Sequence, residues 1–189
     1  MSESTTCAAL LAGGRSKRMG HAKHDIQIDG KPMLQIMAEL ALSCCDDLII
    51  AGPPGLLPEY DHASDVPEHQ GFGPLAGIEA ALLSGRGNRW LILPCDMPRL
   101  RSSDLVTLLQ HAATICCFSD PKDPDRMLNL PMALDASHVC NLTQSLDAGI
   151  RSVGRWLTME NAAMVAPLDP VTTINLNTPE DVEQIQNND

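Results

Sequence analysis

The chain has 189 residues, of which 44% are hydrophobic and 20% charged, as expected of one domain with a large buried core. Its formal net charge of −11 argues against general electrostatic attraction to nucleic acid or to an anionic membrane. An anionic ligand would therefore need a local cluster of positive charge.

The seven cysteines are odd in number and show no Cys-x-x-Cys pairing, and two adjacent pairs, Cys44–Cys45 and Cys116–Cys117, lie in apolar runs. We interpret them as reduced, buried thiols. Residues 1–6 lack the apolar core of a signal peptide, and no apolar stretch approaches the roughly 20 residues needed to span a bilayer. We expect a cytoplasmic monomer without nucleic-acid or membrane partners.

The first predicted element is an apolar strand over residues 7–12, of the kind found at the centre of a parallel sheet. Gly13 and Gly14 follow it, and glycines let backbone N–H groups approach a ligand closely. The segment that follows is positively charged although the whole chain is acidic, because it contains four cations, Arg15, Lys17, Arg18 and Lys23. A tight turn alone would explain two glycines, but the adjoining cations favour a site for the phosphates of a nucleoside triphosphate.

Helices and strands are then predicted to alternate along the chain. Apolar residues at helical spacing predict helices over 32–42, with Pro32 near the first turn, over 75–83, and from Ser102 onward behind the capping residues 102–104. Apolar runs predict buried strands over 47–52, 90–96 and 112–118, whereas residues 119–126 have the composition of an exposed loop. Alternation of this kind predicts a parallel sheet with right-handed crossovers.

Two carboxylates are candidate ligand-binding groups. Asp96 directly follows a predicted strand and should lie at the carboxyl edge of the sheet, where one Asp, together with triphosphate oxygens, could hold Mg²⁺. Asp65 precedes the glycine-rich segment 71–77, which we expect to fold over a base or ribose before the next helix begins. Taken alone, Asp65 is as often a solvated loop residue, and Asp96 a helix cap. No histidine shows metal-ligand spacing, and none is assigned a role.

Five segments together resemble the molybdenum cofactor guanylyltransferases, the MobA family of the nucleotidyltransferase superfamily. They are Leu11-Ala12-Gly13-Gly14-x-Ser16-x-Arg18-Met19-Gly20-x-x-Lys23, Gly30-Lys31-Pro32, Gly73-Pro74-Leu75-Ala76-Gly77, Cys95-Asp96-Met97-Pro98 and Asn175-Leu176-Asn177-Thr178-Pro179-Glu180-Asp181. The resemblance runs nearly from end to end. It implies a single three-layer α/β/α, Rossmann-like domain over residues 1–189 with a mostly parallel sheet, in which about residues 1–100 bind the nucleotide and 101–189 face the acceptor.

By this resemblance the protein transfers GMP from magnesium-GTP to the terminal phosphate of molybdenum-carrying molybdopterin, and pyrophosphate leaves. Molybdoenzymes or cofactor-inserting chaperones would receive the product. Lys23 would bind phosphates, Asp65 the nucleoside and Asp96 the magnesium ion, and Arg18 is added to the catalytic residues on charge grounds. Further nucleotide contacts are implied for Leu11, Ala12, Gly13, Gly14, Gly73, Pro74 and Leu75. The acceptor would lie at Asn175, Asn177 and Thr178, beside the family-like segment 152–157.

The sequence departs from the family pattern in three places. Ala22 stands where many members have Asp, Asn129–Leu130 where they have His-Pro, and Ala51–Gly52 where relatives often have Asn. Two alternatives therefore stay open. One is another nucleotidyltransferase of this fold, using CTP with molybdopterin or making a nucleotide sugar; the glycine loops argue against it. The other is a non-catalytic nucleotide- or cofactor-binding protein, against which Lys23 and Asp96 argue.

Overall fold

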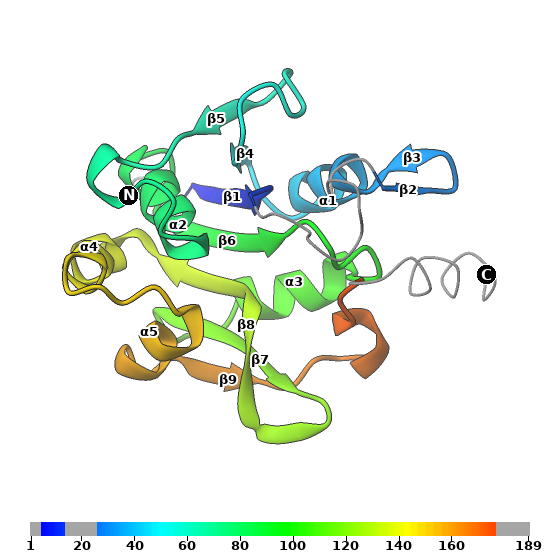
Figure 1. Ribbon diagram of the computed structural model, residues 1–189. Coiled ribbons are helices and arrows are strands. Elements are labelled where there is room, and N and C mark those ends of the chain that lie inside the picture. The colour runs from blue at the N-terminus through cyan, green and yellow to red at the C-terminus, as the bar shows by residue number, and fades with distance from the viewer. Residues whose placement is uncertain (1–4, 14–25, 177–189) are drawn as a thin grey trace.

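A seven-stranded sheet runs through the middle of the molecule in the computed structural model, which describes residues 5–13 and 26–176 (Figure 1). The strand order is β5-β4-β1-β6-β8-β7-β9, and β8 lies antiparallel between β6 and β7 while the other neighbours are parallel. The strands are β1 (Thr6–Leu11), β4 (Asp47–Ala51), β5 (Asp61–Ala63), β6 (Arg89–Pro94), β7 (Ile115–Asp120), β8 (Asp123–Asp135) and β9 (Ala163–Val165). The predicted mostly parallel sheet is confirmed.

Helices cover both faces of this sheet. They are α1 (Met33–Leu42), α2 (Pro74–Leu83), α3 (Ser102–Leu109), α4 (Val139–Asp147) and α5 (Val153–Met159), with 3₁₀ turns η2 (Pro67–His69), η3 (Ala136–His138) and η4 (Pro170–Thr173). A separate hairpin pairs β2 (Gln27–Ile28) with β3 (Lys31–Pro32) ahead of α1. None of the helices in the described ranges is both long and apolar enough to cross a membrane.

Strand β1 shows how the two helical layers attach. Cys7, Ala9 and Leu11 point into the core shared with α2, α4 and α5, whereas the alternate residues Ala8 and Leu10 join the core shared with α1 and α3. This alternation follows from the two-residue period of a strand. Because both faces of β1 are covered, its sequence is apolar throughout, and the three-layer α/β/α arrangement is confirmed.

One local expectation needs correction, and the expected positions of Pro32 and of the α3 cap are defined more closely. Residues 119–126 do not form an irregular loop, because β7 and β8 continue into an exposed hairpin that turns at Pro121 and Lys122. Pro32 precedes the first turn of α1 as its N-cap. Helix α3 is capped by Asp104, whose carboxylate accepts a hydrogen bond from Arg101 N at 3.2 Å. Polar residues can pair in a hairpin as long as one face stays in water, so composition alone did not reveal these strands.

The cysteines are free thiols of two kinds. Five are buried as expected, but Cys44 is half-buried and Cys140 is exposed. Burial raises the pKa of Cys7 to about 11 and the pKa of Cys45 and Cys117 to about 12. These three side chains are therefore protonated and unreactive at neutral pH, and they serve as small apolar residues of the core.

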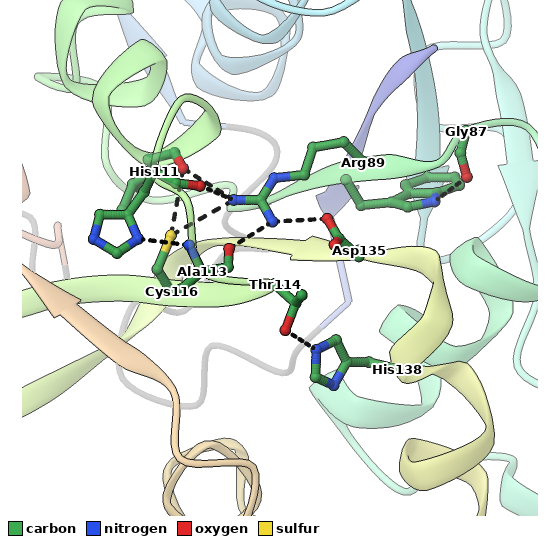
Figure 2. Close-up of polar contacts among 10 residues, drawn as sticks. Gly87, Arg89, His111, Ala113, Thr114, Cys116, Asp135 and His138 are labelled. Atoms are coloured by element: carbon green, nitrogen blue, oxygen red, sulfur yellow. Dashed lines mark hydrogen bonds and ion pairs between the residues drawn. The ribbon is translucent and has the colours of Figure 1, made fainter. Parts of the chain in front are cut away.

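The amino-terminal edge of the sheet is held by Arg89 (Figure 2). Its guanidinium donates to Asp135 Oδ1 at 2.9 Å and to the carbonyl oxygens of Ala113, Leu108 and His111 at 3.1, 3.2 and 3.4 Å. A cavity of about 560 Å³ opens beside it. Since these acceptors already engage the guanidinium, Arg89 acts as a structural tie between β6, β8 and α3, and we assign no ligand to this cavity.

Replacing Arg89 by Met should therefore lower the free energy of unfolding by about 2–4 kcal/mol, because a partly buried ion pair and three carbonyl contacts are lost together. The matched control is Arg86→Met, which removes ion pairs with Asp47 and Asp61 from a side chain that is 35% exposed, against 13% for Arg89. For this control we expect a loss of about 1 kcal/mol or less. Urea titration followed by circular dichroism measures both, and equal losses would contradict the role given to Arg89.

Candidate functional site

The predicted phosphate loop begins at the carboxyl end of β1. Ala12 N donates to Ala51 O at 2.9 Å, so the sheet pairing continues to Ala12 before the chain leaves the sheet. Gly13 is exposed, and among the described residues nothing lies within 4 Å of the position that a Cβ on Gly13 would take. The described residues therefore leave the backbone at Gly13 uncovered at the carboxyl edge of the sheet, as a loop that binds a ligand through its N–H groups requires.

Gly52 shapes this loop from the neighbouring strand, and the sequence analysis did not identify it as a site residue. A Cβ on Gly52 would lie 3.0 Å from both the carbonyl carbon and the Cβ of Ala12 and 3.2 Å from Gly13 N. The end of β4 can approach the loop this closely only because residue 52 has no side chain. Any side chain at residue 52 would therefore displace residues 12 and 13.

The second predicted segment leads into the predicted helix over residues 75–83. Helix α2 begins one residue earlier, at Pro74, so the later part of the glycine-rich segment 71–77 is helical and only residues 71–73 precede the helix. A Cβ on Gly77 would lie 3.3 Å from Ala51 Cβ and 3.4 Å from Leu11 Cδ2. This glycine thus allows α2 to pack closely against the ends of β1 and β4. Gly73, with φ of 82°, adopts a left-handed conformation suited to glycine just before the helix.

Asp65 closes the loop that leads to α2. Its Oδ2 accepts a hydrogen bond from Gly71 N at 2.9 Å, and the side chain is partly exposed. Strands β4 and β1 separate β5, which precedes Asp65, from β6, which precedes Asp96. Three strand spacings correspond to about 14 Å. Asp65 and Asp96 would therefore contact different parts of one extended ligand rather than the same ion.

Asp96 lies just beyond the end of β6, and the C-terminal motif returns to it. The backbone carbonyl of Asp96 accepts a hydrogen bond from Leu176 N at 2.8 Å. Leu176 is buried in a small cluster with Ile28 and Met33, which fixes the segment in place, and the adjoining Asn175 is exposed. The structure thus brings Asn175 and Asp96 together although nearly 80 residues separate them in the sequence.

A magnesium site at Asp96 fits the described residues only if the substrate supplies most of the ligands. Within residues 5–13 and 26–176, no three His, Cys, Asp or Glu side chains gather as a metal site. Mg²⁺ needs hard oxygen ligands and usually takes one or two carboxylates with phosphate oxygens and water. A single partly exposed carboxylate at a strand end matches that requirement.

Five predicted site residues lie outside the described part of the chain, so their roles stay predictions: Gly14, Arg18, Lys23, Asn177 and Thr178. The predicted site residues that the structure does describe form two main groups at the carboxyl edge of the sheet. Leu11, Ala12 and Gly13 lie at the end of β1 beside β6 and Asp96, whereas Asp65, Gly73, Pro74 and Leu75 surround the start of α2.

The amino-acid sequence of this chain is similar to the sequences of known proteins. The MobA-like NTP transferase domain matches residues 8–166. The molybdenum cofactor guanylyltransferase of Ectopseudomonas mendocina (strain ymp) is 36% identical over 180 residues, covering 90% of this chain and 87% of that protein. A probable molybdenum cofactor guanylyltransferase from Trichormus variabilis is 32% identical over 195 residues, covering 95% of this chain and 89% of that protein.

Solved structures share the fold. Molybdopterin-guanine dinucleotide biosynthesis protein A from Archaeoglobus fulgidus has a TM-score of 0.75 at 20% identity, covering 96% of this chain and 97% of its own. A CMP-2-keto-3-deoxy-manno-octonic acid synthetase complexed with CTP has a TM-score of 0.72 at 16% identity, covering 97% and 98%. The fold is therefore the one that these nucleotidyltransferases share. Since the domain match spans most of its length, the chain belongs to the MobA-like NTP transferase family.

A Gly52→Ala substitution should weaken the binding of a nucleoside triphosphate, with GTP as the probe, about tenfold or more, because the added Cβ must displace the backbone at residues 12 and 13. The matched control is Gly87→Ala at the opposite edge of the sheet, where a Cβ would lie 2.8 Å from Cys7 Sγ and 3.0 Å from Thr5 O. Both variants should lose stability in urea titration, but calorimetry should find weaker GTP binding only for Gly52→Ala. Equal GTP affinities in the two variants would refute the role of Gly52.

Proposed function

We propose that this protein transfers GMP from magnesium-GTP to the terminal phosphate of molybdenum-carrying molybdopterin, forming a guanine dinucleotide cofactor and pyrophosphate. The observation that carries the proposal is the contact between the Asp96 backbone and Leu176, which places the segment bearing Asn175 beside the strand end that bears Asp96. An acceptor bound near Asn175 would thereby reach the nucleotide. The guanylyltransferase relatives at 36% and 32% identity support the choice of substrates.

The reaction requires the protein to position the substrates and to neutralise phosphate charge, and it requires no strong base. The acceptor phosphate is already an anion, so its oxygen can attack the α-phosphorus in line while the bond to pyrophosphate breaks. Ala12 and Gly13 would orient the triphosphate through their backbone, and Asp65 would contact the nucleoside at the far end of the site. Mg²⁺ held by Asp96 would supply neutralisation of the phosphate charge.

The roles proposed for two cationic residues rest on the sequence alone. Lys23 would bind the triphosphate, and Arg18 would stabilise charge that develops on the transferred phosphoryl group. On this scheme residues up to about 100 form the nucleotide half, and the later residues form the acceptor half. A histidine is not needed in either half as a catalytic base, in agreement with the assignment of no histidine to the chemistry.

The test is a parallel incubation of the purified protein with Mg²⁺, molybdenum-loaded molybdopterin and either GTP or CTP. We expect pyrophosphate release and dinucleotide product with GTP, and at least about tenfold less with CTP, since a site that hydrogen-bonds one base leaves polar groups unpaired with another. Equal or better turnover with CTP would identify a cytidylyltransferase of the same fold. Nucleotide binding without product would identify a non-catalytic carrier.

Asp96→Asn should reduce kcat/KM for the magnesium-dependent transfer by about 100-fold or more, because the neutral amide is a weaker ligand for a divalent cation. The control is Asp46→Asn, which alters a carboxylate that accepts a hydrogen bond from Thr6 N at 2.9 Å, away from the carboxyl edge. This variant should keep wild-type turnover. Undiminished activity in Asp96→Asn, measured by pyrophosphate release, would rule out the metal assignment.

A further inference from the structure

A buried ionic network lies behind the segment 65–73, which we call the nucleoside loop. His69 Nδ1 lies 2.7 Å from Glu79 Oε2 on α2, and His69 Nε2 lies 3.2 Å from Asp147 Oδ1 at the end of α4. Thr143 Oγ1, also on α4, donates to the other oxygen of Glu79 at 2.6 Å. The network therefore attaches η2, in the middle of the loop, to two helices that belong to different halves of the chain.

Because Glu79 is buried, its carboxylate needs the partners that this network supplies. The side chain is only 1% exposed, and an ionised carboxylate at such a depth is costly unless it is paired and hydrogen-bonded. His69, with 5% of its side chain exposed, is the adjacent cation. Both of its ring nitrogens face carboxylates, and only the protonated imidazole can donate from both at once. The geometry therefore selects the charged form of His69.

A second contact holds the end of the same loop. The Phe72 ring lies 5.6 Å from the His69 ring, centroid to centroid, and Arg151 Cζ lies 3.8 Å from the Phe72 centroid in a cation–π arrangement. Arg151 belongs to the connection between α4 and α5. Within the loop, Phe72 N donates to His69 O at 3.0 Å, so a shift of His69 would move the residue next to Gly73 directly.

We propose that His69 is a positioning residue for nucleotide recognition: its ion pair with Glu79 holds the nucleoside loop, and with it Asp65, in the shape that binds GTP. The inference rests on the proposed function, which assigns Asp65 and the start of α2 to the nucleoside. His69 does not touch the substrate. It acts through Gly71, whose N–H meets the Asp65 carboxylate, and through the backbone that runs from His69 to Gly73.

The ion pair also predicts a pH dependence. The hydrogen bond to Glu79 raises the pKa of His69 above its ordinary value, although burial alone would lower it, and Asp147 adds to the rise. The charged groups near His69 are Glu79 on α2, Asp147 on α4 and, across Phe72, Arg151. A raised pKa in the folded state gives stability that is complete below about pH 6.5, the ordinary value, and is lost as the pH rises through the raised value. GTP affinity should fall over that same interval.

The first experiment compares His69→Gln with His138→Gln. His138 is a matched control. Its Nε2 lies 3.0 Å from Thr114 Oγ1 (Figure 2), and its Nδ1 lies 2.8 Å from Glu160 Oε2, in a pair that supports α4 and α5 instead of the loop. We expect His69→Gln to raise the KM and the Kd for GTP about tenfold with kcat within about twofold, and His138→Gln to leave all three unchanged. Amide hydrogen exchange of residues 64–73 should accelerate only in His69→Gln.

The second experiment tests the charge itself through the double variant His69→Gln with Glu79→Gln. Removing the buried carboxylate together with its partner should restore GTP affinity to within about threefold of wild type, because a neutral pair can replace a buried ion pair at little cost. The pH dependence due to His69 should disappear. Ionisation of GTP affects every variant equally, so the difference between the wild-type and double-variant profiles isolates His69, even where the single variant does not fold.

The outcomes separate the two proposals. Wild-type GTP affinity in a folded His69→Gln variant, or wild-type and double-variant pH profiles that coincide, would overturn the inference while leaving the guanylyltransferase proposal intact. A double variant that folds but binds GTP as weakly as the single variant would also overturn it. Failure of the wild-type protein to bind GTP would instead overturn the proposed function, and the positioning role that rests on it would fall at the same time.

Discussion

Burial of β1 on both faces is the constraint on which the rest of the structure depends. Helices α2 and α1 pack against opposite faces of this strand, and β4 and β6 hydrogen-bond to its two edges. The strand is therefore enclosed everywhere except at its ends, and its small side chains allow both helical layers to approach. At the carboxyl end the chain leaves the sheet at Gly13, where backbone N–H groups are available to a ligand.

The C-terminal segment of the described chain reaches this edge through a long-range contact. Leu176 is held in the cluster with Ile28 and Met33, next to the β2–β3 hairpin, and its N–H meets the carbonyl oxygen of Asp96. Residues from the beginning, middle and end of the chain are thereby fixed around one strand end. In a chain with a net charge of −11, two phosphorylated substrates can meet there only if local cations offset the repulsion. The sequence concentrates such cations just after Gly13.

Continuous apolar runs sufficed to predict β1, β4 and β6, which are buried on both faces, and apolar residues at helical spacing sufficed to predict α1 and α2. It did not predict β5, which has three residues, or the antiparallel insertion of β8 between β6 and β7, since pairing across the sheet depends on contacts remote in sequence. The placement of Asp96 after a strand was predictable from one apolar run. The role of Gly52 was not, because its close approach to Ala12 exists only in three dimensions.

Two histidine–glutamate pairs within residues 5–13 and 26–176 show that the effect of a contact depends on which elements it connects. His69 with Glu79 and His138 with Glu160 have nearly equal N···O separations, 2.7 and 2.8 Å, and both are largely buried. The second pair joins elements of the scaffold, so its loss would lower the free energy of unfolding. The first joins the scaffold to a segment that begins at Asp65, the carboxylate that we propose contacts the nucleoside, and ends at the start of a helix. Apolar side chains could supply the same stability. A charged imidazole between two carboxylates also fixes orientation, which a loop that reads a nucleoside requires.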